Sequence, residues 1–148
     1  MLIIPTTAER KNLANKLTQT NRLGSFTATL EVEPFDYKAQ FGYLRLDDLK
    51  KYNIQAYIDS PERMFNFAIF LPRGAVEGTV RVSTNPYSDT TAYAVYLAAF
   101  DGGIKFFIGS SGFVKYKYYP AEARIEGDFE YRCVLGKIFK GSFNVNEE

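Results

Sequence analysis

The residues that decide the fold are Glu122-Ala123-Arg124-Ile125-Glu126-Gly127-Asp128-Phe129-Glu130-Tyr131. Apart from Gly127, apolar side chains occupy every second position of this stretch, and charged side chains occupy the positions between them. Successive side chains of a β-strand point to opposite faces of the sheet. The alternation therefore predicts a strand with one face in the core and one face in water.

The same alternation recurs in Gly24–Pro34 and Val76–Thr84, whereas Phe65–Leu71 and Tyr93–Phe100 are apolar on both faces. The second kind predicts central strands that are covered on both sides. Turn-forming sequences separate the runs, among them Asn85-Pro86-Tyr87-Ser88-Asp89, Ser110-Ser111-Gly112 and the strongest hairpin signal, Asp101-Gly102-Gly103. We therefore predict an all-β fold, an antiparallel β-sandwich of about eight to ten short strands, with a barrel as the alternative.

The beginning of the chain follows a different pattern. Thr6-Thr7-Ala8-Glu9 has the spacing of a helix capping box, and Leu13 and Leu17 follow four residues apart. These features predict a short helix from about residue 7 to 19, which covers one opening of the main body or serves as a partner-binding arm. The chain then divides into an N-terminal helical segment, residues 1–22, and a single antiparallel β domain, residues 23–148.

The composition excludes several chemistries. The chain has 148 residues, no His, one Cys and a formal net charge of +1. Without His, this chain alone cannot supply a Ser-His-Asp or Cys-His nucleophile system or a His-containing zinc site. No phosphate loop, dinucleotide fingerprint or calcium loop occurs, so we expect no cofactor, no metal site and no catalytic residues. The near-neutral charge gives no electrostatic reason to expect nucleic acid as a partner.

The sequence carries no targeting signal that we recognise. Its start lacks the basic region and apolar stretch of a secretory signal, although a signal removed from the chain would leave no trace. The longest uncharged apolar stretch, Thr90–Phe100, is much shorter than the roughly 20 residues of a transmembrane helix. We expect a soluble protein with no transmembrane segment, for which a cytoplasmic location is favoured and non-classical export stays open.

Two groups of surface residues have a functional and a structural interpretation. The carboxylates of Glu122–Glu130 form an acidic face, which is either a binding ribbon or a solvated face that is ion-paired with Lys115 and Lys117. In Gly112–Tyr119, Val114, Tyr116 and Tyr118 share one face. This row is either a platform for a ligand or the edge of the core, and we favour the structural interpretation of both groups.

A candidate ligand site follows if the strands from Val76 onward form a meander. Successive turns of a meander alternate between the two ends of the sheet, so the loop Asn85–Thr91, the turn Ser110-Ser111 and the turn Arg132–Gly136 would share one end. The loop offers stacking and hydrogen-bonding groups suited to a polar ligand. The candidate ligand-binding residues are Asn85, Tyr87, Asp89, Ser110, Ser111 and Arg132.

We therefore expect a soluble, non-enzymatic binding or interaction module. Its partner would be a carbohydrate, a lipid head group or a protein, held by the end loops or by a Tyr-bearing face. The alternatives are a carboxylate-based hydrolase on a β scaffold and a structural subunit of an oligomer, because neither paired carboxylates across a cleft nor oligomeric state can be read from one sequence.

Overall fold

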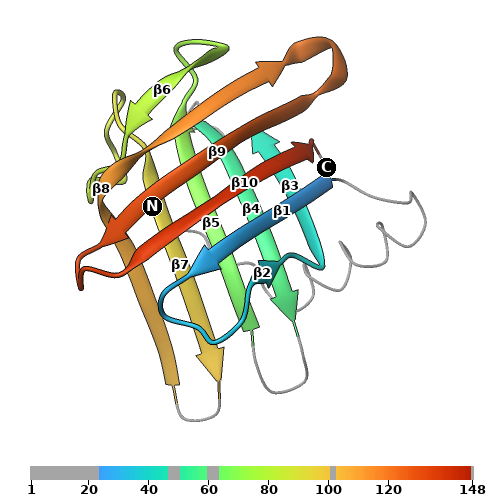
Figure 1. The fold of residues 1–148 in the computed structure, drawn as a ribbon. Coiled ribbons are helices and arrows are strands. Elements are labelled where there is room, and N and C mark those ends of the chain that lie inside the picture. Colours follow the sequence, from blue (N-terminus) through green and yellow to red (C-terminus); the bar gives the residue numbers. More distant parts are fainter. Residues whose placement is uncertain (1–23, 47–50, 60–63, 101–102, 148) are drawn as a thin grey trace.

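The computed structural model describes residues 24–46, 51–59, 64–100 and 103–147. They form ten antiparallel strands in one strongly curled sheet, a half-barrel (Figure 1). The strands are β1 (Gly24–Leu30), β2 (Tyr37–Lys38), β3 (Phe41–Leu46), β4 (Lys51–Asp59), β5 (Met64–Pro72), β6 (Glu77–Arg81), β7 (Tyr93–Phe100), β8 (Gly103–Tyr119), β9 (Arg124–Cys133) and β10 (Ile138–Asn146). The predicted all-β antiparallel class and strand number are confirmed.

The strand order is β2-β1-β10-β9-β8-β7-β5-β4-β3, and β6 also pairs with β8. The long strand β8 belongs to two halves of the sheet. Its first part pairs with β7 in half B, which also contains β5, β4 and β3, and its second part lies between β6 and β9 in half A, which continues through β10, β1 and β2. Figure 1 shows half A in front of half B, with the strands of the two halves crossing.

β8 changes halves at an irregularity in its pairing. The register with β9 shifts between Gly109 and Ser111, and Gly112 has a φ of 120°, in the region that favours glycine. The prediction of a turn at Ser110-Ser111-Gly112 is therefore wrong, because a β-bulge uses the same small and flexible residues without ending the strand.

The space between the two halves is filled with aromatic side chains. Phe26 of half A lies 5.0 Å from Phe67 of half B, measured between ring centroids. Phe67 is fully buried, and its ring also lies 4.8 Å from Tyr96 and 5.7 Å from Phe129. Val114 and Tyr116 point inward as well, which confirms the structural interpretation of the tyrosine row. Between the described strands, the interior is a packed aromatic core.

The central strands of half B, β5 and β7, are buried on both faces, as their sequences predict. Residues 66–71 of β5 and 93–98 of β7 are all buried. The outward residues Ala68, Phe70, Tyr93 and Val95 form a second, smaller apolar cluster, against which Ile108 packs.

Three other predictions concern the order of elements along the chain. β7 and β8 pair from Phe100 opposite Gly103, as the hairpin signal predicts, although residues 101 and 102 themselves lie outside the described residues. The predicted helix at residues 7–19 also lies outside them. The prediction of a meander from Val76 onward is wrong for β6, which pairs with β8 and not with β7, whereas β7, β8, β9 and β10 pair in sequence order.

Candidate functional site

The structure places the predicted ligand-binding residues in two groups. Ser110, Ser111 and Arg132 come together on β8 and β9, where Ser111 is opposite Arg132 and the Ser110 hydroxyl donates a hydrogen bond to the Arg132 carbonyl at 3.1 Å. The Arg132 guanidinium in turn donates to the Gly136 carbonyl at 2.9 Å. These contacts fasten the bulge to the neighbouring strand.

The second group lies in the loop between β6 and β7. The Asn85 side-chain oxygen accepts the Tyr87 N–H at 3.0 Å, which is a turn-forming role, while the Tyr87 side chain is exposed and Asp89 lies in an exposed part of the loop. The Lys51 ammonium of β4 donates to the Ser88 carbonyl. The Lys51 contact joins the loop to β4, whereas Ser111 lies on β8, and β7 stands between these two strands in the sheet. A single ligand that contacts both Tyr87 and Ser111 stays a prediction.

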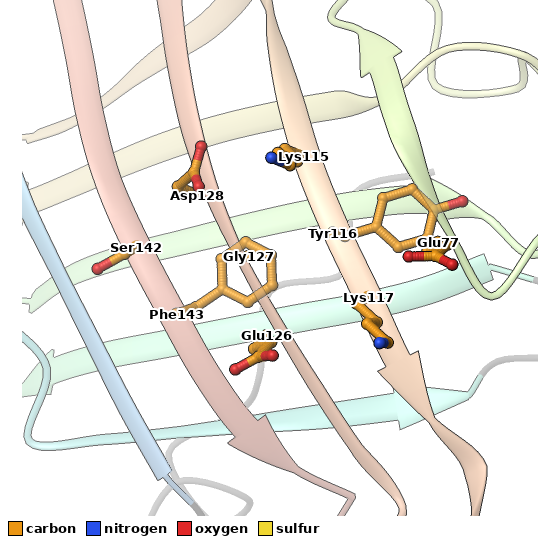
Figure 2. A pocket seen from close by; sticks show the side chains of 9 residues that line it. All are labelled: Glu77, Lys115, Tyr116, Lys117, Glu126, Gly127, Asp128, Ser142 and Phe143. Carbon is orange, nitrogen blue, oxygen red and sulfur yellow. The ribbon is translucent and has the colours of Figure 1, made fainter.

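A hollow of about 440 Å³ lies on the outer face of half A, across β6, β8, β9 and β10. Figure 2 shows its lining, in which ionisable side chains surround Gly127. The lining residues are Glu77, Lys115, Tyr116, Lys117, Glu126, Gly127, Asp128, Ser142 and Phe143. The backbone of Gly127 lies in the middle of the hollow, and its Cα faces the core on the other side, where the ring of Phe143 packs against it.

Opposite charges face each other across the strands of the hollow. Lys115 is opposite Asp128, and Lys117 stands between Glu126 on β9 and Glu77 on β6. This register agrees with the interpretation of the acidic face as a solvated, charge-balanced surface. Such exposed pairs contribute about 0–1 kcal/mol each to stability.

Glu126 is the best-connected carboxylate of the hollow. It accepts a hydrogen bond from the Tyr119 hydroxyl and another from the Arg124 guanidinium, the latter at 3.4 Å. The Tyr119 hydrogen bond, followed by the charges of Arg124 and Lys117, lowers the pKa of Glu126. A carboxylate with a lowered pKa accepts hydrogen bonds at neutral pH and is poorly suited to general acid catalysis.

A different surface is apolar and lies at the first part of β8. Ile104 and Phe106 are 57% and 42% exposed, and Val134 and Leu135 in the turn between β9 and β10 are 61% and 70% exposed. The Val134 N–H donates to the Ile108 carbonyl at 3.1 Å, which places this turn beside the same strand. We call Ile104, Phe106, Val134 and Leu135 the apolar edge surface.

Sequence reasoning identified charged residues of the hollow, Lys115, Lys117, Glu126 and Asp128, but not the hollow itself, and it missed the apolar edge surface. The hollow lies across four strands, and the apolar edge surface lies where β8 lacks a described neighbour, so both depend on strand order. Strand order could not be read from the sequence.

Comparisons with protein-family models, with curated proteins and with solved structures find no match. Within the part of the chain that the structure describes, no three potential metal-ligating side chains of His, Cys, Asp or Glu come together. No helix among residues 24–46, 51–59, 64–100 and 103–147 combines the length and the apolar character that crossing a membrane requires.

Proposed function

We propose that the chain is a non-enzymatic protein-interaction module that binds a partner protein through the apolar edge surface. The observation that carries this proposal is the exposure of Ile104, Phe106, Val134 and Leu135 on adjoining parts of the molecule. Scattered exposed apolar residues are ordinary on a protein surface, but a group of large ones at an unpaired strand is typical of an interaction site.

The other predicted functions find less support in the hollow and in the interior. A lipid head group is normally held by unpaired cations, whereas Lys115 and Lys117 each face a carboxylate. An interior ligand site is disfavoured because aromatic rings fill the space between the halves of the sheet. A hydrolase would need a carboxylate with a raised pKa as its acid, and the pKa of Glu126 is lowered.

The test compares two surface variants in proximity labelling in cells of the source organism. One variant carries Ser in place of the four residues of the apolar edge surface. The control carries Ser at Val76 and Phe113, which are exposed elsewhere. We expect labelling of at least one protein to depend on the apolar edge surface and to persist in the control, followed by direct binding of the purified pair. Identical labelling by both variants would refute the proposal.

The hollow supports a second candidate function, the binding of a carbohydrate. Sugar hydroxyls can donate to Glu77, Glu126 and Asp128 and accept from Lys115 and Lys117, so the balanced charges of the lining suit an uncharged polar ligand. Asp128→Asn should weaken binding on a glycan array at least several-fold. Turnover of chromogenic glycosides that disappears in the same variant would instead support the hydrolase alternative.

A further inference from the structure

The first part of β8, Gly103–Ile108, has one of the described strands on only one side. It pairs with β7 from Phe100 opposite Gly103 to Val95 opposite Ile108. On its other side the pairing with β9 begins only at Gly109, and none of the described strands lies beside residues 103–107. Among the residues that the structure describes, this part of β8 is therefore an open sheet edge next to the apolar edge surface.

The backbone groups of this edge are directed toward the open side at alternate residues. The Ile108 carbonyl faces the β9 side, because it accepts the Val134 N–H at 3.1 Å. N–H and C=O groups change direction with each residue of a strand, so those of Phe106 and Ile104 face the same side. An added strand can thus form hydrogen bonds with both groups of both residues.

The side chains of the edge have an apolar-basic-apolar order. Ile104 and Phe106 share the outer face of the sheet, and the exposed Lys105 lies between them on the opposite face. A lysine within an exposed apolar edge discourages indiscriminate strand pairing, because most added strands would leave its charge without a partner. The same lysine favours a strand that brings a carboxylate.

We propose that this edge accepts an extended segment of a partner protein in which an acidic residue stands between two apolar residues. The apolar residues would lie against Ile104 and Phe106, and the acidic residue would pair with Lys105 across the new strand boundary. The inference rests on the proposed function, since it names the partner chemistry for the same surface. It is the strand-addition mode of recognition, in which the backbone supplies affinity and alternate side chains supply specificity.

A second copy of this chain fits the edge poorly. Antiparallel pairing that sets Ile104 against Phe106 of the copy also sets Lys105 against Lys105, which is a repulsive cross-strand pair. Pairing centred on Phe106 would bring Ile104 of the copy to the position beside Ile108 that Val134 occupies. Pairing centred on Ile104 leaves only Gly103–Lys105 in contact, because β8 begins at Gly103.

The test measures fluorescence anisotropy of two labelled peptides with the full chain. The probe is Ser-Thr-Val-Glu-Val-Thr-Ser, and its twin has Lys in place of Glu. We expect the Glu peptide to bind about 3- to 10-fold more tightly than the twin, from one favourable and one repulsive cross-strand pair. Lys105→Glu should reverse this preference, whereas Lys38→Glu, the same charge change on the exposed part of β2, should leave it unchanged.

A backbone variant tests the strand geometry separately. Phe106→Pro removes an outward N–H and an apolar contact while leaving the β7 ladder its own hydrogen bonds, so both peptides should lose binding. Equal affinity for the two peptides, or a preference that Lys105→Glu does not change, would overturn the inference. Dimerisation of the wild-type chain that Phe106→Pro abolishes would favour the second copy instead.

The two proposals fail in different ways. If the peptides do not bind but a partner still depends on the apolar edge surface, the surface is right and strand addition is wrong. If no partner depends on that surface, the proposed function fails, whatever the peptides do.

Discussion

Gly127→Ala should destabilise the protein, because the strands around Gly127 leave no room for a methyl group. A Cβ atom there would lie 2.2 Å from the Lys115 carbonyl oxygen and 2.8 Å from Cζ of Phe143, where ordinary contacts begin near 3.4 Å. The carbonyl belongs to the paired part of β8 and cannot rotate away as a side chain can. The ladder between β8 and β9 must therefore open by about 1 Å.

Overpacking of this kind costs about 1–3 kcal/mol, and the backbone obstruction places Gly127→Ala at the upper end. Replacing Gly also restricts the unfolded chain, which offsets about 0.4–1 kcal/mol. The net loss of about 2 kcal/mol corresponds to a fall in melting temperature of roughly 4–8 °C for a chain of this size. Differential scanning calorimetry and urea unfolding measure both quantities.

Gly78→Ala is the matched control on β6, which pairs with β8 and places Gly78 opposite Tyr116, the residue that faces Gly127 from the other side. A Cβ atom at Gly78 meets nothing within 4 Å, so we expect an unchanged or slightly higher melting temperature. Equal effects of the two substitutions would refute the reasoning, because the difference between them depends only on the space that the structure assigns to each site.

Three further predictions concern the core and the pH dependence of stability. Phe67→Ala should lower the free energy of unfolding by about 3–5 kcal/mol in urea titration, since it removes a fully buried ring, and a loss below 1 kcal/mol would contradict the packed interior. Burial, and for Tyr96 also its hydrogen bond to Glu33, raises the pKa of Tyr96 and Tyr131 well above the ordinary value of about 10. Stability should therefore fall above about pH 10, where only the unfolded chain loses these protons, and absorbance at 295 nm should show both tyrosines still protonated in the folded protein. Because the pKa of Glu126 is lowered, its carboxylate stabilises the fold at pH values above the ordinary range of about 4–5. This stabilisation is lost as the pH falls through the lowered pKa, so Glu126→Gln should flatten the acid side of the stability profile.

Local alternation made the strands and their faces predictable. In β9 every second residue from Ile125 is inward apart from Gly127, and residues 66–71 of β5 are buried on both faces as a continuous apolar run indicates. These properties depend on neighbours in the sequence and on the period of a strand, so a single sequence contains them.

The pairing of strands could not be predicted in the same way. Short turns suggested that β6 and β7 would pair, but the loop between them allows β6 to join β8 and β7 to join β5. Glu33 illustrates the same limit. It has the sequence context of a solvated carboxylate, yet it accepts a hydrogen bond at 2.7 Å from the hydroxyl of the core residue Tyr96, more than 60 positions along the chain. Such contacts are fixed by packing between distant segments.

The pairing of β1 with β10 makes completion of the sheet a late event during synthesis. Gly24 lies opposite Val145, so β1 must wait for almost the whole chain to emerge before that edge is covered. The two positions are roughly 120 residues apart, but the entropic cost of closing a loop grows only with the logarithm of its length. The separation therefore delays the pairing of β1 more than it lowers the stability of the fold. Because Gly24 and Val145 are neighbours in space, a short linker between them would let translation begin in the Asn85–Thr91 loop instead. In that circular permutant β1 would follow β10 directly, and the two strands would pair as a hairpin as soon as both had been synthesised.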